Sequence, residues 1–301
     1  MAKLISADLI NNKLCILEYT TTDGQMLSFK EDAFDAKIVS HTYTDIGKVI
    51  FYKPITKIGE YAFYNCTSLT SVTIPGSVTT IGEEAFAFCD SLTSVTIPDS
   101  VTTIGRNAFT VCSSLASVTI LDSVTTIGEG AFAACDSLIS VTIGNGVTTI
   151  GGCAFFCANL KEFKGKFAAD GGRCLIMDGV LNAFALGCGA TQYTIPDSVT
   201  TIGVSAFYYC KSLTSVTIPD SVMTIGYYAF YECKSLKNIT IGKGVIEIGK
   251  QAFKECNIDT IVCCPKIPPK IYDSFGKFEN LIVPTGCEET YANSDWGQYL
   301  E

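Results

Sequence analysis

A 15-residue pattern of alternating apolar and polar positions recurs along most of the chain. The copy that begins at Ser91 reads SLTSVTIPDSVTTIG, and similar copies begin at Ser68, Ser114 and Ser212. Within it, alternate residues are apolar, which is the period of a half-buried strand. Self-similarity at a fixed period of roughly 20–50 residues is typical of a solenoid, in which each coil packs against its neighbours. The pattern therefore predicts architecture more strongly than chemistry.

An Ala-Phe pair marks the register of the repeat. In seven of nine intervals, successive Ala-Phe pairs are as far apart as Ala62 and Ala85 are. The two intervals that begin at Ala33 and at Ala154 are six positions longer. The pairs are Ala33-Phe34, Ala62-Phe63, Ala85-Phe86, Ala108-Phe109, Ala131-Phe132, Ala154-Phe155, Ala183-Phe184, Ala206-Phe207, Ala229-Phe230 and Ala252-Phe253. Each repeat is expected to form a strand, a turn, a short extended arc, a turn and a short helix, with a bend at the glycine represented by Gly105. About ten coils should result, with a parallel sheet on one face and short helices or turns on the other.

The two longer intervals are interpreted as coils extended by a hairpin. RCLIMDGVLNAF places Asp178-Gly179 between two apolar runs, which is a strong hairpin signal. A second hairpin is expected across Thr44 to Gly47, and two more strand-like runs flank Asp23-Gly24. We therefore expect an N-terminal cap with hairpins over 1–54 and a solenoid over 55–262, with an atypical hairpin coil at about 160–190.

The repeat decays after Cys256, where prolines interrupt it. A last strand is expected at LIVP, which begins at Leu281, followed by a polar, helix-like tail that holds the single Trp. Residues 263–301 are therefore interpreted as a C-terminal cap, because a solenoid must close the ends of its core.

The chain has 15 cysteines, and eight of them occupy one column of the repeat. They are Cys66, Cys89, Cys112, Cys135, Cys157, Cys210, Cys233 and Cys256. Column residues point the same way in every coil, and a buried free Cys behaves as a small apolar residue. The odd total also argues against a complete disulfide set. We expect buried, reduced thiols without a ligand.

Composition and motifs give little support for catalysis, metal binding or cofactor binding. The net charge of −9 and the absence of a Lys/Arg cluster argue against a nucleic-acid partner. No apolar run is long enough for membrane insertion. The single histidine, His41, has no fixed partner in the sequence, and the spacing Cys153-x3-Cys157 does not match a structural zinc site. The sequence thus offers no catalytic residue, no cofactor-binding residue and no metal ligand.

Two surfaces are candidates for recognition. The first is an outward row of threonines on the strands, represented by Thr96, Thr119 and Thr217; such residues also serve simply as soluble strand residues. The second is a tyrosine cluster whose members are Tyr208, Tyr209, Tyr227, Tyr228 and Tyr231. Phe and Cys already fill the inward positions there, so several tyrosines must be at least partly exposed, although packing between turns is an alternative. Clustered exposed tyrosine is frequent at recognition surfaces.

The residues just described resemble the BspA-like leucine-rich repeats of bacterial surface proteins and some protists. The match is a 23-residue unit of the form SLTSVTIPDSVTTIG followed by xxAFxxC, and it covers about residues 55–260. The Pro-Pro and Tyr-x4-Trp region at 265–299 resembles the C-terminal cap of that family. The resemblance implies an α/β, right-handed leucine-rich repeat solenoid and no catalytic residues.

The resemblance also implies a function. We expect a non-enzymatic module for binding or adhesion, with a protein or glycan ligand, at a bacterial cell surface or secreted. The alternative is a purely structural spacer or assembly component. The N-terminal segment MAKLISADLINNKLCILEY has no basic stretch followed by an apolar one, so no signal peptide is expected in this chain. Either the protein stays in the cytoplasm or a leader was removed.

Overall fold

The computed structural model describes residues 14–300, which fall into two compact units. Unit 1 runs to Leu160 and includes Lys164–Lys166, and unit 2 consists of Lys161–Phe163 and the chain from Phe167 onward. Both units are stacks of coils with parallel sheets and very little helix, which confirms the predicted solenoid fold class. The three-part division into caps and solenoid stays a prediction. Residues 1–13, on which the expectation about a signal peptide largely rests, lie outside the described residues.

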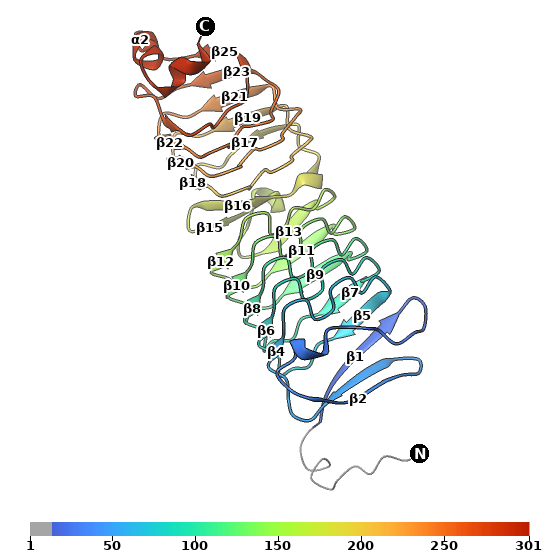
Figure 1. The fold of residues 1–301 in the computed structure, drawn as a ribbon. Coiled ribbons are helices and arrows are strands. Elements are labelled where there is room, and N and C mark those ends of the chain that lie inside the picture. Colours follow the sequence, from blue (N-terminus) through green and yellow to red (C-terminus); the bar gives the residue numbers. More distant parts are fainter. Residues whose placement is uncertain (1–13, 301) are drawn as a thin grey trace, which may run out of the picture. The chain divides into compact units, whose positions relative to one another are not determined.

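In unit 1 the repeats form two rows of parallel strands (Figure 1). The row of longer strands contains β5 (Leu69–Thr73), β7 (Ser94–Thr96), β9 (Ser117–Ile120) and β11 (Ser140–Ile143). The row of two-residue strands contains β4 (Lys57–Ile58), β6 (Thr80–Ile81), β8 (Thr103–Ile104), β10 (Thr126–Ile127) and β12 (Thr149–Ile150). Paired residues are one repeat apart, as Val118 and Val141 are. The second row is the extended arc expected from the sequence. Strand β13 (Glu162–Gly165) lies at the sequence boundary of the two units.

The N-terminal end of unit 1 is an antiparallel addition to the first row. Strands β2 (Ile38–Tyr43) and β3 (Gly47–Phe51) form the predicted hairpin, after the 3-10 helix η1 (Glu31–Ala33). Strand β1 (Cys15–Thr21) lies between β3 and β5 and pairs antiparallel with both. The second strand-like run, after Gly24, joins no sheet, so this part of the prediction is wrong. Because β1 already has a partner on each side, that run cannot pair with it as the second strand of a hairpin.

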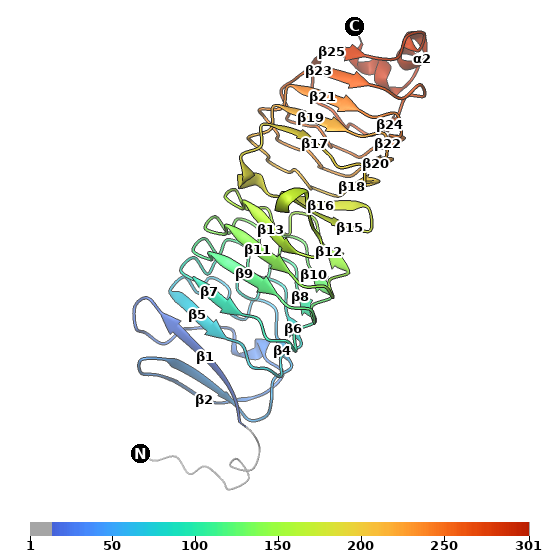
Figure 2. The ribbon, with the colours of Figure 1, turned by 180° about the vertical axis from the view of Figure 1, so that it is seen from behind.

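Unit 2 begins with the hairpin coil (Figure 2). Strands β15 (Cys174–Met177) and β16 (Val180–Phe184) pair antiparallel across Asp178-Gly179, as predicted. Both turn residues have positive φ, 48° and 78°, the signature of a type I′ turn. The same sheet contains β14 (Ala168–Ala169), β18 (Thr201–Ile202), β20 (Thr224–Ile225), β22 (Glu247–Ile248) and β24 (Lys270–Ile271). Short 3-10 helices, η2 (Asp170–Gly172) and η3 (Leu186–Cys188), flank the hairpin.

A second sheet of unit 2 carries the longer strands and is followed by the C-terminal tail. Its strands are β17 (Gln192–Thr194), β19 (Ser215–Ile218), β21 (Asn238–Ile241), β23 (Ile258–Cys263) and β25 (Phe278–Ile282), the last of which is the strand expected near Leu281. The tail forms α2 (Glu288–Ala292) and the 3-10 helix η4 (Asp295–Tyr299) (Figure 1). Tyr291 and Trp296 from these helices are fully buried and belong to the core of this unit.

The apolar positions of the repeat line the core. Ile104 is fully buried, whereas Val95, in the middle of β7, is half-buried. Phe rings of successive coils stack: the centroids of Phe86 and Phe109 are 5.1 Å apart with an interplanar angle of 3°, and those of Phe230 and Phe253 are 4.9 Å apart with an angle of 6°. Burial of such side chains stabilises the fold by about 1.5–3 kcal/mol each.

The short helix expected in each repeat is replaced by a chain of turns. Asn107 and Val111 have positive φ, 52° and 56°, so a regular helix cannot form there. Alternate N–H groups bond within the coil and across to the next coil: Ala108 N donates to Gly105 O (3.3 Å) and Phe109 N to Ala131 O (2.8 Å). Gly105 is needed for close approach rather than for a bend, since a Cβ there would lie 2.7 Å from the backbone of Gly82.

The cysteine column is buried, as predicted, and its thiols are free. Several of these thiols also make a polar contact that a purely apolar side chain could not make. The Sγ of Cys112 lies 3.2 Å from the carbonyl oxygen of Phe86 and that of Cys233 lies 3.1 Å from Phe207 O, each in the preceding coil. An S–H group is a weak donor, so each thiol links two coils.

Aspartates in the turn after a longer strand also link coils. Asp122 Oδ1 accepts from Asn145 N and Asp220 Oδ1 from Lys243 N, each at 2.8 Å and one coil further along.

Candidate functional site

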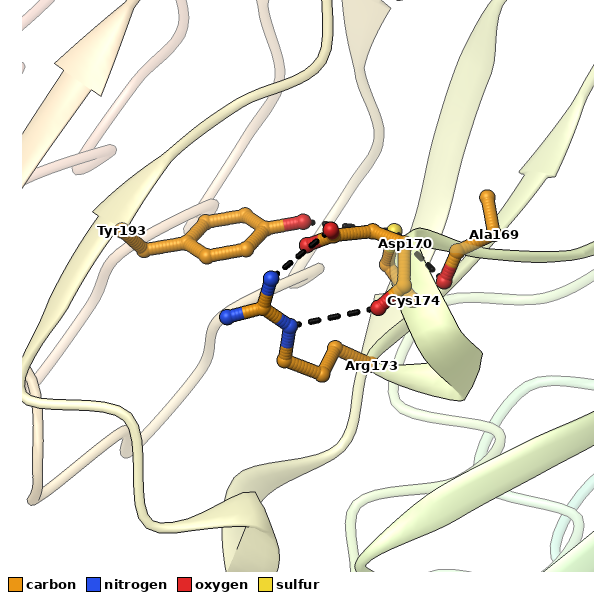
Figure 3. Close-up of polar contacts among 5 residues, drawn as sticks. All are labelled: Ala169, Asp170, Arg173, Cys174 and Tyr193. Carbon is orange, nitrogen blue, oxygen red and sulfur yellow. Dashed lines mark hydrogen bonds and ion pairs between the residues drawn. The ribbon is translucent and has the colours of Figure 1, made fainter.

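The hairpin coil of unit 2 holds a polar cluster of Asp170, Arg173, Cys174 and Tyr193 (Figure 3). Arg173 Nη2 lies 2.7 Å from Asp170 Oδ1, and the guanidinium carbon lies 5.4 Å from the centroid of the Tyr193 ring. The Tyr193 hydroxyl donates to Cys174 Sγ at 3.4 Å. These contacts attach the hairpin to strand β17.

This cluster does not have the chemistry of a nucleophilic site. Cys174 is fully buried, and burial raises the pKa of its thiol. A reactive cysteine needs the opposite, a lowered pKa and access to solvent. Burial likewise raises the pKa of Tyr193. The sequence analysis missed this cluster, although one signal was available: Tyr193 stands in the strand column that Val216 occupies one coil later.

His41 has a partner that its sequence context did not predict. Its Nε2 lies 2.7 Å from the hydroxyl oxygen of Tyr19, which also accepts a hydrogen bond from Leu27 N at 3.1 Å. Burial lowers the pKa of His41 and raises that of Tyr19. The imidazole thus joins β2 to β1 and to the segment after β1.

Residues 14–300 contain neither a cluster of metal-binding side chains nor a helix suited to a membrane. No group of three or more His, Cys, Asp or Glu side chains in this range is arranged to hold a metal ion. Within the same range, no helix combines the length and the apolar character that crossing a bilayer requires.

The five predicted tyrosines form what we call the tyrosine surface, on the turns of two successive coils of unit 2. The rings of Tyr208 and Tyr231 stack with centroids 5.5 Å apart, and Tyr228 meets Tyr231 edge-on at 5.4 Å. Tyr209 lies 5.0 Å from Tyr208. Tyr227, which precedes Tyr228, is the most exposed of the five at 53%. The structure therefore brings four of the rings into one contiguous group.

Charged side chains border the tyrosine surface. Lys211 Nζ lies 5.9 Å from the centroid of the Tyr209 ring, within the range of a cation–π contact. Glu232 pairs with Lys234 at 2.8 Å. A hydrogen bond with Glu232 raises the pKa of Tyr209. Rings with hydroxyl groups, together with charges of both signs, can contact peptides or sugars.

The predicted threonine row points away from the core, as the alternation requires. Thr96 and Thr119 in unit 1 are exposed, and Thr217 in unit 2 is half-buried. Thr119 pairs with Thr142 and Thr217 with Thr240 in parallel register, so the hydroxyl groups are repeated from strand to strand. This surface is polar and uncharged, and in unit 1 Thr119 and Thr142 line a pocket together with the turn at Asp122.

A second aromatic group, in unit 1, was largely missed. Tyr61, Tyr64 and Phe88 are exposed, with Tyr64 5.6 Å from Tyr61 and 5.4 Å from Phe88. Tyr61 and Tyr64 share the repeat columns of Tyr228 and Tyr231. The signal was present in the sequence, because the repeat positions of Tyr61 and Tyr64 hold small or polar residues in most other coils.

A family model described as "BspA type Leucine rich repeat region" matches residues 56–166 and 181–293, with six copies. No curated protein matches the chain.

Solved structures of bacterial leucine-rich repeat proteins are similar to the chain. One, from Eubacterium ventriosum, is 27% identical with a TM-score of 0.59, over 74% of this chain and 63% of that one. This chain thus spans less than two thirds of that structure. Another, from Bacteroides ovatus, is 27% identical with a TM-score of 0.43, over 76% of this chain and 72% of that one. A leucine rich cell surface protein from Faecalibacterium prausnitzii is 24% identical with a TM-score of 0.41, over 90% and 95%.

Proposed function

Since this chain belongs to the BspA-type leucine-rich repeat family, we propose that it is a non-enzymatic module that binds a protein or glycan ligand at a bacterial cell surface. The observation that carries the proposal is the tyrosine surface. Solenoids present extended, rigid faces and use them for partner contact. The family supports the surface location.

The tyrosine surface is suited to binding because the fold does not require it. Ala206, Phe207 and Cys210 already fill the core positions of their coil. Tyrosine supplies a large contact area at a low entropic cost, with a hydroxyl group that can fix orientation. The pKa values of the cysteine thiols support binding over catalysis, because a reactive cysteine needs a lowered pKa. Burial raises the pKa of Cys66 to about 11, and it raises that of Cys174 as well.

The proposal is tested with a triple variant, Tyr208→Ser, Tyr228→Ser and Tyr231→Ser. Glycan and protein arrays probed with the wild-type chain identify the ligand, and calorimetry then measures its affinity for both chains. We expect binding to fall at least about tenfold, as is common when aromatic anchors are removed. A matched control, Tyr61→Ser with Tyr64→Ser, removes exposed rings in unit 1 and should retain the affinity. Equal affinity of the triple variant and the wild type would refute the tyrosine surface as the binding site.

The alternative is a spacer or assembly component. Under that hypothesis, the tyrosine surface or the threonine row is covered by self-association. Sedimentation of the wild type and the triple variant separates the two. A stable oligomer that the triple variant loses favours assembly, and a monomer in both cases favours ligand binding.

A further inference from the structure

The C-terminal cap of unit 2 forms an apolar cleft away from the tyrosine surface, with which it shares no residue. The cleft has a volume of about 470 Å³. It is lined by Lys243, Val245, Ile246, Cys264, Pro265, Lys266, Ile267 and Pro284. One wall is the corner between β21 and β22, and the other is the loop that follows β23.

That loop is held in place at both ends. The buried Tyr291 hydroxyl donates to Pro265 O at 2.8 Å, and the buried indole Nε1 of Trp296 donates to Pro269 O at the same distance. Between these points, Ile267 is 82% exposed. Covering this isoleucine with an apolar side chain of a ligand would stabilise the complex, because apolar surface gains stability on burial.

The opposite wall of the cleft includes a repeat position that is polar in earlier coils and apolar in the last ones. In earlier coils that column is threonine, whose hydroxyl donates to a carbonyl one coil back, as Thr102 and Thr125 do. In the last coils the column holds Met223 and Ile246, which are 50% and 65% exposed. Because isoleucine replaces threonine at this position, Ile246 adds a second exposed apolar side chain beside Ile267.

The charge of the cleft is opposite to that of the chain. Two of its eight lining residues are lysines and none is acidic, whereas the whole chain carries −9. Lys243 lies 3.4 Å from Asp220 Oδ2, and Lys266 makes no ion pair with any other residue that the structure describes. At physiological salt, charges beyond about 8–10 Å are screened. A short acidic segment would therefore sense these lysines, while an extended anionic surface would also meet the acidic remainder of the protein.

We propose that this cleft docks a short acidic segment of a partner protein, with a bulky apolar side chain between Ile246 and Ile267 and its carboxylates beside Lys243 and Lys266. The apolar walls supply affinity, and the lysines supply orientation and rate of association.

The test uses the full chain and a fluorescein-labelled octapeptide in which Phe-Leu is flanked by pairs of Asp, with fluorescence anisotropy as the readout. A matched peptide replaces each Asp with Lys. We expect saturable binding of the acidic peptide only, with an affinity that falls as salt rises. The cleft variant, Ile246→Ser with Ile267→Ser, should weaken binding at least about tenfold. Lys266→Glu should weaken binding of the acidic peptide more at low salt than at high salt.

Control variants separate the cleft from general effects. Ile139→Ser and Lys57→Glu change exposed residues of unit 1 and should leave binding unchanged. The tyrosine triple variant should also leave it unchanged, which distinguishes a failure of this proposal from a failure of the proposed function. Because Ile246 and Ile267 are exposed, the cleft variant should keep the wild-type unfolding midpoint.

Three results would overturn the proposal. The first is no saturable binding of the acidic peptide up to about 1 mM, the weak limit of specific recognition. The second is equal affinity of the cleft and control variants. The third is a different occupant: vesicles of mixed phosphatidylcholine and phosphatidylserine that bind the wild type but not Lys266→Glu, or a dimer that Ile267→Ser dissociates.

Discussion

The coils at 85–135 in unit 1 and those at 206–256 in unit 2 have the same core and different surfaces. In both, Phe rings stack closely, with centroids 4.6 to 5.2 Å apart and interplanar angles of 3° to 9°. In both, column cysteines face the carbonyl of the Phe one coil back, as Cys112, Cys135, Cys233 and Cys256 do, whereas Cys210 contacts the Ser212 hydroxyl. The column that follows Phe holds Ala87, Thr110 and Ala133 in unit 1 but Tyr208 and Tyr231 in unit 2. The fold is therefore complete without these rings, and the difference points to recognition.

The largest expected effect comes from breaking the shared core. Phe109→Ala in unit 1 and Phe230→Ala in unit 2 should each lower the free energy of unfolding by about 3–5 kcal/mol, because each leaves a cavity between two stacked rings. Urea unfolding followed by circular dichroism measures both. A cost below about 1 kcal/mol in either unit would mean that the two stacks are not equivalent.

A smaller effect is expected at the cysteine column. Cys112→Ala and Cys233→Ala should each lower the free energy of unfolding by about 1–2 kcal/mol, since each removes the sulfur volume and leaves a carbonyl without its weak donor. In the native wild type these thiols should also fail to react with a thiol reagent, because a hydrogen bond with the Cys135 thiol together with burial raises the pKa of Cys112, and burial raises that of Cys233. Rapid labelling of Cys112 in the folded chain would contradict this account of the column.

Much of this fold could be predicted because the repeat period assigns every residue to a column. Burial of Phe109 and Cys112 and the Asp178-Gly179 hairpin follow from spacing alone. The helix in each repeat could not be excluded, since Ala108, Phe109 and Cys112 have helical spacing as well. What prevents it is a set of hydrogen bonds to the next coil, which only stacking creates. They hold Asn107 and Val111 at positive φ, a conformation that a glycine marks at the Asn107 position one coil later, Gly130, with a φ of 61°.

The residues of the tyrosine surface could be predicted from the sequence, but the contacts among their rings could not. Five tyrosines on positions outside the core indicated a surface. Which rings touch depends on the distance between coils, so the stacking of Tyr208 on Tyr231 came only from the structure. Tyr193 was missed although its column, which holds Val216 one coil later, gave a signal. Ile267 was missed because it becomes notable only when Ile246 is placed beside it.

The pH response should distinguish the two units, because the single histidine lies in unit 1. Burial lowers the pKa of His41 below its unfolded value, while the neighbouring Glu31 acts in the opposite direction. The unfolded chain therefore binds more protons than the native chain near that pKa, so stability should fall as pH decreases through about 6.5 and level off below the native pKa.

Hydrogen exchange at pH 7.5 and 5.5 checks this response. Protection of β1, β2 and β3 should decrease at the lower pH, and protection of β19 and β21 should not. In His41→Gln, which keeps a hydrogen-bonding group but cannot titrate, the decrease should disappear. An equal pH response in the variant would assign it to carboxylates instead.

The largest effect on binding, with a modest effect on stability, should come from giving unit 2 the surface of unit 1. The variant Tyr208→Thr, Tyr228→Asn and Tyr231→Ala places in each column a residue that unit 1 has there, at Thr110, Asn107 and Ala133. The free energy of unfolding, measured in urea, should fall by about 0.5–1.5 kcal/mol for each of the three ring contacts that are lost. Affinity for the ligand identified on the arrays, measured by calorimetry on the same samples, should be lost. Unfolding of the variant, or full retention of the affinity, would contradict the assignment of these rings to recognition.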